Sequence, residues 1–596
     1  MKTFIYGIFV CFSFIYMIKS KLHSNFKEIK EEGGYLKFLH EKATANSDPE
    51  SVNDVIFASI RLNEDVKRYE DDASDYQLKV LYGTYDEEAL AYLKFTPGLN
   101  KKGWDFLALS SYQGNDERYS DDLKSYAMGY LEGVVTADKI WNHYTNQKRY
   151  YFFEQPNLEM PKSTRLFLQR NAEFIREMGK KHGENDPYWY HAHLIHRQLE
   201  GMLAGYNSVA EESKNLTLED LNVCNARGDL SELAYYNETL RPAFKVMTPY
   251  EIFDYIEEHS HCSALIKVAP DFSDVWFGHN TWTNFSSMMR IFKEYRFRSN
   301  KNTEKSRVVA FSGYPAVLTS IDDFYITDQD IFITETTNTI FDTKLYDVLT
   351  PESLLTWLRS ILANRLSSDA KTWTEVFAKY NSGTYNNQFQ ILDLKLIDTE
   401  KKVISDNAFW IIEQIPGMTK SQDMTHILRY GYWPSYNSAY FTEIRTISGY
   451  DEQLKLHPEL KDSIDYSGSA RANIFRRDQS KVHDLESYKN MLRYNDFNND
   501  PLSKKNPALA IACRGDLDQK KPNCRGATDA KVASIHDIKG KAKKKITIIS
   551  GPTHDQQPTF DFLDTKCNGN GRYSFNGLPT YFDFPWIEYE TELFDY

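Results

Sequence analysis

The order of strand-like and helix-like stretches constrains the fold of this chain more than any other feature. After Cys262, short runs rich in β-branched and aromatic residues alternate with turn residues, helical runs follow, and strand-like runs return. Strands grouped apart from helices favour stacked layers over a βαβ repeat, and no internal repeat is visible. The sequence therefore predicts an α+β fold. The strand-like runs cover residues 262–268, 274–280, 307–313, 316–327, 330–338, 388–397 and 408–416, and the helical runs cover residues 353–366 and 370–381.

The part of the chain before Cys262 mixes both patterns. The run KGWDFLALSSY (residues 102–112) is typical of a strand, whereas residues 126–144 and 164–203 have apolar residues at helical spacing. Residues 205–249 show little periodicity, so we expect a long surface segment suited to proteolytic processing. A short helix should follow, with Thr248 as its N-cap and proline at its first position.

The first 20 residues, MKTFIYGIFVCFSFIYMIKS, have the composition of a cleaved secretory signal. Lys2 supplies the positive charge, residues 4–18 form an apolar run that is short for a membrane span, and Ser20 is a small residue at the expected cut. We therefore expect a soluble mature protein that is secreted or lysosomal. Glycosylation sequons fit that compartment and occur at Asn215, Asn237 and Asn284.

The charge of the chain limits its partners. A formal net charge of −13 argues against a nucleic-acid binder, which needs a basic surface to meet phosphates. The basic run KAKKK (residues 541–545) reads better as a solvated strand start than as a lipid or phosphate site. No second apolar run approaches the length of a membrane span, so contact with lipid surfaces is expected to be peripheral at most.

The cysteine count suggests one special thiol. The chain has six cysteines and Cys11 leaves with the signal, so the five that remain cannot all pair. Cys513 and Cys524 would close a short loop and form the simplest candidate disulfide. Cys224 and Cys567 are expected either to pair or to stay free. Cys262 is the candidate free thiol.

Other motifs carry less weight. The chain lacks G-x-S-x-G, a P-loop and a G-x-G-x-x-G that follows a strand. His193, His196 and Glu200 share one helical face and could bind zinc, but H-E-x-x-H is missing, so packing is the better interpretation and we predict no metal or cofactor. The tripeptide Arg514-Gly515-Asp516 is interpreted as a turn rather than an adhesion signal.

Cys262 itself has two interpretations. A cysteine that begins a strand is usually a small core residue. However, His259 and His261 lie just upstream, and the next strand ends at His279-Asn280. If the two strands form an antiparallel hairpin, the thiol, an imidazole and an amide meet at one end, which is a plausible nucleophilic site.

Several long motifs are similar to those of the phospholipase B-like (lamina ancestor-like) proteins, and the similarity covers nearly the whole mature chain. The family implies a four-layer αββα sandwich of the N-terminal nucleophile hydrolase type, whose precursor cuts itself before the nucleophile. On this chain the cut falls between His261 and Cys262. It gives fragments 21–261, with a processing segment at about 205–261, and 262–596, which together form one unit. The motifs include HCSALIKVAPDFSDVWFGHNTW, SGYPAVLTSIDDFYIT, NSGTYNNQFQILDL, GYWPSYNSAYF, MLRYNDFNNDP and SGPTHDQQP.

The resemblance also implies roles for individual residues. After the cut, the α-amino group of Cys262, with an ordinary pKa of ~7.7–8.0, can take the proton of its own thiol. His279 orients the substrate or the amine, and Asn437 is the candidate oxyanion donor. Arg476 is the candidate charge near the site, with Arg471 as its rival; each of these groups could instead be a structural polar residue. The candidate pocket residues are Thr336, Thr337 and Trp282.

The implied activity is the removal of acyl chains from glycerophospholipids through a thioester at Cys262. Because the same chemistry cleaves amides, an amidase that acts on N-acyl compounds or small peptides is the alternative. A non-catalytic secreted binding protein that keeps the fold is the alternative from a different class.

Overall fold

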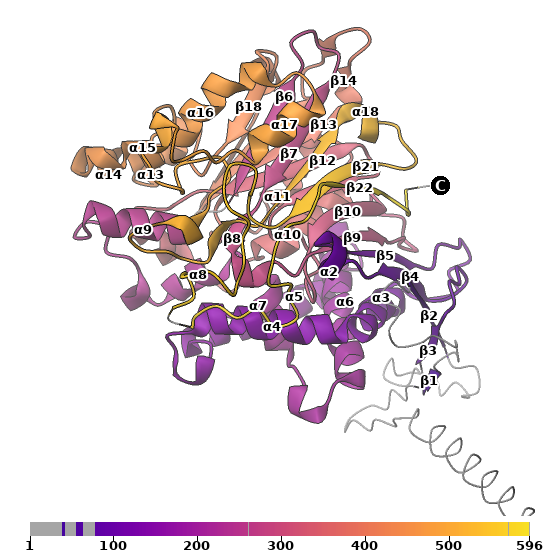
Figure 1. Cartoon of the computed structure of the whole chain (residues 1–596). Helices are drawn as coiled ribbons and strands as arrows, with labels where there is room; N and C mark the ends of the chain where they lie inside the picture. Colours follow the sequence, from indigo (N-terminus) through magenta and orange to yellow (C-terminus); the bar gives the residue numbers. More distant parts are fainter. Residues whose placement is uncertain (1–38, 42–54, 63–77, 260–261, 570, 595–596) are drawn as a thin grey trace, which may run out of the picture.

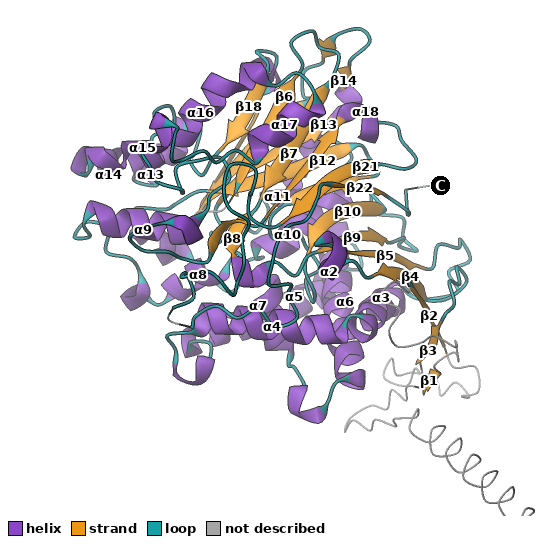
Figure 2. Cartoon of the chain, viewed as in Figure 1, coloured by secondary structure: helices purple, strands orange, loops and turns teal. Residues whose placement is uncertain are grey.

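The computed structural model describes residues 39–41, 55–62, 78–259, 262–569 and 571–594 (Figure 1). Two large sheets and many helices make up this part of the chain (Figure 2), which confirms the predicted α+β class. The predicted signal sequence and His261 lie outside the described residues.

The larger sheet has twelve strands in the order β1-β3-β2-β4-β5-β9-β10-β11-β12-β13-β16-β17. The pairs β1–β3 and β5–β9 are parallel, and the other neighbours are antiparallel. The sheet therefore joins strands from both sides of Cys262. Its strands are Leu39–Glu41, Leu78–Tyr82, Ile56–Leu62, Ala91–Thr96, Asp105–Ser111, Ile291–Arg296, Val308–Gly313, Phe324–Thr327, Ile331–Thr337, Asn387–Asp393, Phe409–Ile415 and Met418–Asp423, in sheet order.

The smaller sheet has six strands in the order β18-β6-β7-β20-β21-β22, with β6 and β7 near its middle. Its strands are Tyr432–Ser435, Ser263–Val268, Val275–Asn280, Asp529–Ser534, Lys545–Ser550 and Ile587–Glu590, in sheet order. Two further pairs are β14 (Ile397–Asp398) with β15 (Val403–Ile404), and β8 (Trp282–Asn284) with β19 (Arg525–Ala527).

The two sheets share one apolar core. Side chains alternate along a strand, so every second residue of β6 and β7 points the same way, and these residues join a buried cluster with residues of the larger sheet. Phe277 of β7 and Phe332 of β12 mark the contact, with ring centroids 4.5 Å apart. The near-continuous apolar strands of the sequence are explained by this burial on both faces.

Helices cover the outer faces of both sheets (Figure 2). Leu265, Trp276 and Val532 of the smaller sheet pack against α16 (Ala470–Asp478) and α17 (Leu485–Leu492). The larger sheet packs against a group of helices, namely α3 (Asp121–Val135), α4 (Ala137–Phe152), α5 (Lys162–His182), α6 (Pro187–Val209), α10 (Thr356–Leu366) and α11 (Ala370–Phe377).

The other α-helices of the described residues have at most 11 residues each. They are α2 (Leu99–Lys102), α7 (Leu218–Asn225), α8 (Leu230–Leu233), α9 (Pro249–His259), α12 (Thr425–Leu428), α13 (Thr442–Ile447), α14 (Tyr450–Leu456), α15 (Lys461–Ile464) and α18 (Ile535–Ile538). Among the described residues, none of the helices combines the length and apolar composition that a membrane crossing requires.

Helices α3 and α6 pack unusually closely. A side chain at Gly129 or Gly201 would collide with the backbone of the partner helix, at Gln198 and Tyr126 respectively. Only glycine allows this approach, which explains two glycines within helical runs that would otherwise be costly.

Thr248 caps α9 as predicted, because its hydroxyl accepts a hydrogen bond from the Glu251 amide at 3.3 Å while the Glu251 carboxylate accepts from the Thr248 amide at 2.7 Å. The expectation of one long surface segment over residues 205–249 was wrong for residues 221–233, most of which are buried, whereas residues 236–249 are mostly exposed or half-buried. Helix α6 continues to Val209, and α7 buries Leu221 and Val223 against the helices that cover the larger sheet.

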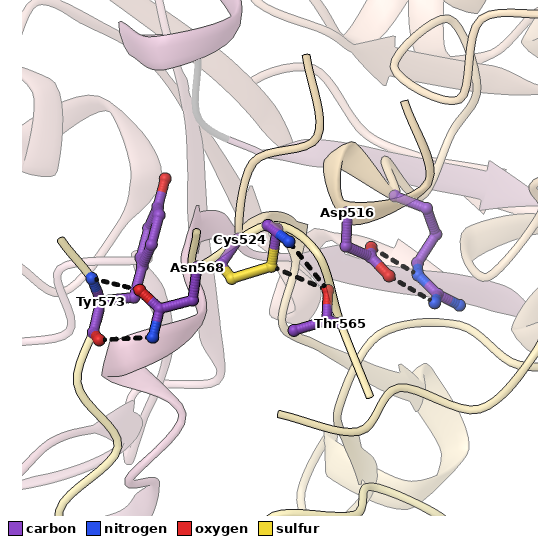
Figure 3. The surroundings of a disulfide bond; sticks show 7 residues. Asp516, Cys524, Thr565, Asn568 and Tyr573 are labelled. Carbon is purple, nitrogen blue, oxygen red and sulfur yellow. Dashed lines mark hydrogen bonds and ion pairs between the residues drawn. A yellow bond between two sulfur atoms is a disulfide. The ribbon is translucent and has the colours of Figure 1, made fainter. Parts of the chain in front are cut away.

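The predicted Cys513–Cys524 disulfide was also wrong. Cys524 pairs with Cys567 across 43 residues, with Cα atoms 5.1 Å apart (Figure 3), while Cys513 and Cys224 are free and buried. The short sequence separation favoured the wrong partner, whereas folding brings the loop before β19 against residues 565–573.

The three sequons differ in their surroundings. Asn215 is exposed and Asn237 is half-buried, so both can carry a glycan. Asn284 is completely buried in β8, and its Nδ2 donates to Gln147 Oε1 at 3.3 Å. Since no glycan fits at a buried position, the structure contradicts Asn284 as a glycosylation site.

Candidate active site

The hairpin of β6 and β7 brings Cys262 to the predicted neighbours. Ser263 pairs with Asn280 and Ala264 pairs with His279, so the start of β6 meets the end of β7. Asn280 fixes this junction: its Oδ1 accepts from the Ser263 amide at 3.0 Å and its Nδ2 donates to the Leu492 carbonyl at 2.6 Å. The spatial part of the prediction is therefore confirmed.

The thiol of Cys262 lies in a buried group that includes an acidic side chain from the other sheet. Cys262 is 1% exposed, and its Sγ lies 3.9 Å from Oε1 of Glu335 on β12. The ligand atoms of Cys262, His279 and Glu335 all lie within 4.8 Å of one another. The Tyr385 hydroxyl donates to Glu335 Oε1 at 3.1 Å and so orients this carboxyl.

Burial controls the protonation of both acidic groups. It raises the pKa of the Cys262 thiol well above its ordinary value, an effect that Glu335 reinforces and the Trp282 backbone opposes. Burial and the nearby Asp323 likewise raise the pKa of Glu335 well above its usual range. The thiol and the carboxyl are therefore both protonated at neutral pH, and a negative charge on Glu335 would raise the pKa of the Cys262 thiol further.

The backbone at Cys262 adopts an uncommon conformation. Its φ is 86°, in the left-handed region that non-glycine residues seldom occupy. Such a conformation costs of the order of 1–3 kcal/mol and persists only where surrounding contacts impose it. The strain therefore lies at the residue that follows the predicted cut.

His279 is neutral. Burial, together with the Lys531 ammonium, lowers the pKa of His279 well below its ordinary value. Neither ring nitrogen has a partner at ordinary hydrogen-bond geometry, although the nearby Glu335 backbone favours the protonated ring.

A buried ionic network lies behind His279. Lys531 is directly opposite His279 in the β7–β20 pair, and its Nζ donates to Asp322 Oδ2 at 3.0 Å and Asp529 Oδ1 at 2.8 Å. Arg290 pairs with the same two carboxylates, so two positive and two negative charges balance. Burial raises the pKa of Asp322, but Arg290 and Lys531 outweigh it and hold that pKa well below its usual value.

Arg471, rather than Arg476, is the arginine at the site. Arg471 Nη1 donates to the Cys262 carbonyl at 2.9 Å, and its Nη2 donates to Asn437 Oδ1 at 2.7 Å. Its guanidinium also stacks on the Trp282 ring at 4.3 Å. Arg476 is exposed and donates to the Ser467 carbonyl, so its predicted place near Cys262 was wrong.

The helical periodicity of α16 distinguishes the buried Arg471 from the exposed Arg476. Arg471 shares a face with Ile474 and Phe475, three and four residues later, and this face packs on the smaller sheet. Arg476 lies on the opposite face. Burial lowers the pKa of Arg471 to about 10, so the guanidinium stays charged at neutral pH.

Asn437 and the two threonines form the next part of the site. Asn437 Nδ2 donates to the Thr337 carbonyl at 2.7 Å, and the Asn437 amide donates to Thr336 Oγ1 at 3.3 Å. Thr336 also bonds Ser435 at 2.6 Å and thereby connects β12 to β18. Through Arg471, these residues are linked to the Cys262 carbonyl.

A small pocket reaches Cys262. Its lining includes Thr281, Trp282, Ile321 and Tyr385. Trp282, one of the three predicted pocket residues, thus lines it, while Thr336 and Thr337 lie on the Asn437 side. Sequence reasoning missed Glu335, Tyr385 and Lys531. A charged residue inside the apolar strand IFITETT was the available signal for Glu335.

The weaker motifs have structural roles. His193 Nε2 lies 2.9 Å from Asp122 Oδ1, so this histidine serves an interhelical contact. Arg514 is buried and pairs with Asp516 at 2.7 Å. Figure 3 shows Asp516 near the disulfide. Lys544, in the basic run, forms an ion pair with Asp330.

Comparison with known proteins agrees with this arrangement of motifs. The Phospholipase B family model matches residues 91–589. Phospholipase B-like protein B of Dictyostelium discoideum is 35% identical over 526 residues, 87% of this chain and 88% of the relative. Phospholipase B of Crotalus adamanteus and phospholipase B-like 1 of Bos taurus are each 36% identical over 84% of this chain and 88% of their own length. The chain therefore belongs to the phospholipase B-like family.

Proposed function

We propose that this protein is a self-processing phospholipase B-like hydrolase whose nucleophile is Cys262. The observation that supports it most is the position of Cys262. A strained residue at the start of β6 has its thiol against Glu335 and His279 and its carbonyl bound by Arg471. In this proposal the two packed sheets and their outer helices are the αββα sandwich of N-terminal nucleophile hydrolases.

The first reaction is the cut between His261 and Cys262. The thiol gives its proton to the neutral ring of His279, whose nitrogen lies within 4.8 Å of Sγ, and attacks the His261 carbonyl. The C–N bond breaks as the Cys262 nitrogen takes up a proton, and the His261 acyl group moves to sulfur as a thioester. Water hydrolyses this thioester and restores the thiol. The products are the fragments 21–261 and 262–596.

The same thiol then acts on the substrate. The new α-amine of Cys262 accepts the thiol proton, sulfur attacks an acyl carbonyl, and the alcohol leaves with a proton as the acyl-thioenzyme forms. Water releases the fatty acid. Asn437 and Arg471 supply the N–H groups on this side of the site, and a donor aimed at the oxyanion contributes roughly 10²–10³ in rate.

The substrate class comes from the relatives, which carry the name phospholipase B. We infer an acyl ester of a glycerophospholipid as substrate, and a secreted or lysosomal location as the place of action. The exposed Asn215 and half-buried Asn237 are the proposed glycosylation sites.

The test is a substrate assay on purified protein with phosphatidylcholine in detergent micelles, and with an N-acyl amide in parallel. Cys262→Ala should release no fatty acid. Cys224→Ala, which removes another buried free thiol among the helices that cover the larger sheet, should retain the wild-type rate. Release from the amide alone would reject the phospholipid substrate, and release by Cys262→Ala would reject the nucleophile.

A further inference from the structure

The side chains of Cys262, His279 and Glu335 also have the arrangement of a metal-binding site. Within the part of the chain that the structure describes, it is the one place where three histidine, cysteine or acidic side chains bring ligand atoms close enough to hold a metal ion. Thiolate, imidazole and carboxylate are the three side-chain ligands of Zn²⁺. The chemistry of the group therefore fits a thiophilic divalent cation.

The ligand atoms are available. Both nitrogens of His279 and the Oε2 of Glu335 are buried without a partner at ordinary hydrogen-bond geometry among the described residues. Unsatisfied buried polar atoms are rare and call for an explanation. Tyr385 holds the other oxygen of Glu335, which is the kind of outer contact that orients metal-ligating carboxylates.

The distances are close to those of a bound ion. Zn–N and Zn–O bonds of ~2.0–2.2 Å and a Zn–S bond of ~2.3 Å place tetrahedral ligand atoms roughly 3.3–3.6 Å apart. The observed separations are all within 4.8 Å, with 3.9 Å between Cys262 Sγ and Glu335 Oε1, so they exceed the bound-ion spacing by about 1.5 Å at most. Small rotations of three side chains suffice to close that difference.

The charged groups around Cys262, His279 and Glu335 do not disfavour a bound cation. The positive charges of Lys531 and Arg290 are already paired with Asp322 and Asp529. The Cys262 thiol and the Glu335 carboxyl each release a proton as Zn²⁺ binds, so the ion, the thiolate and the carboxylate sum to zero. The pocket lined by Thr281, Trp282 and Tyr385 gives the ion a route to the thiol.

We propose that Cys262, His279 and Glu335 form a binding site for one Zn²⁺ ion, and that the ion blocks the nucleophile. The binding part stands on the geometry alone, whereas the blocking part rests on the proposed function. Because the three ligands are side chains, the site exists before and after the cut. The cut adds the α-amine of Cys262 as a fourth donor and should tighten binding.

Cobalt(II), which replaces zinc in such sites and is coloured, tests the binding part. Purified full-length protein is titrated with Co²⁺ in oxygen-free, thiol-free buffer. We expect one equivalent with a thiolate-to-cobalt charge-transfer band and tetrahedral visible bands, both removed by Zn²⁺. Cys262→Ser should lose the charge-transfer band, and Cys224→Ala should keep it. The same band in Cys262→Ser, or none in the wild type, would overturn the site.

Glu335→Gln provides a second variant that keeps the side-chain volume. We expect it to weaken Co²⁺ binding by at least the roughly 10–100-fold that loss of an outer-shell contact costs, and unchanged affinity would contradict the site. Thermal unfolding confirms that each variant is folded. Zn²⁺ should also slow appearance of the Cys262 fragment. Binding without slowing would reject only the blocking role, while a chain that never cuts but binds Co²⁺ would reject the proposed processing and leave the metal site standing.

Discussion

Replacement of Arg471 by methionine tests how the site holds Cys262. The change removes three charge-assisted hydrogen bonds, to the Cys262 carbonyl at 2.9 Å, to Asn437 Oδ1 at 2.7 Å and to Ser263 Oγ at 3.2 Å, and keeps an apolar stem beside Trp282. A hydrogen bond to a charged group contributes about 1.5–3 kcal/mol. If half of the free energy of one such bond stabilises the transition state of the cut, its loss raises the activation barrier by about 1 kcal/mol. The cut then slows roughly 5–10-fold.

The matched control is Arg476→Met in the same helix. Arg476 is exposed and its contacts are local, so its loss should change stability by less than about 0.5 kcal/mol and leave the rate of cutting unchanged. The assay follows fragment appearance by intact mass over time, with thermal unfolding to confirm folding. A slower cut in Arg476→Met together with a normal rate in folded Arg471→Met would refute the reasoning.

Three further predictions concern stability. Lys531→Met should destabilise the fold by about 3–5 kcal/mol because it leaves buried carboxylates short of a partner, whereas exposed Lys543→Met should have little effect in the same thermal melts. Burial raises the pKa of Glu294 to about 7, so the folded state binds more protons than the unfolded state between about pH 4.5 and 7. The free energy of unfolding should therefore fall as pH rises through that window. Glu294→Gln should make this fall smaller, and an unchanged slope of melting temperature against pH would contradict the prediction. Cys524→Ser should cost about 4 kcal/mol by loop entropy and add one thiol that reagents detect in the unfolded chain, whereas Cys513→Ser should remove one.

Local patterns predicted the hairpin that carries Cys262. Alternation in β6 and β7 and the turn between them involve neighbouring residues, so the pairing of Ala264 with His279 follows from a short stretch of chain. The cap at Thr248 was predictable for the same reason. The α+β class also followed, because it depends on the order of elements along the chain.

The rest of the site depends on long-range contacts. Glu335 and Tyr385 reach Cys262 from positions 73 and more residues away, and no spacing rule in one sequence specifies which polar residue of a strand meets a distant thiol. Disulfide connectivity has the same problem, and Cys524 therefore received the wrong partner. The position of Arg471 was predictable from the sequence, because the helical periodicity of residues 470–478 identifies the face of the helix that is buried.

The central claim is that the protein breaks its own chain before Cys262. The most direct measurement is intact-mass analysis and N-terminal sequencing of purified wild-type protein and of Cys262→Ala, each held at pH 5 and pH 7. The account predicts a wild-type fragment whose first residue is Cys262, and an uncut Cys262→Ala chain. A wild-type chain that stays intact, or a Cys262→Ala chain that is cut at the same bond, would contradict it.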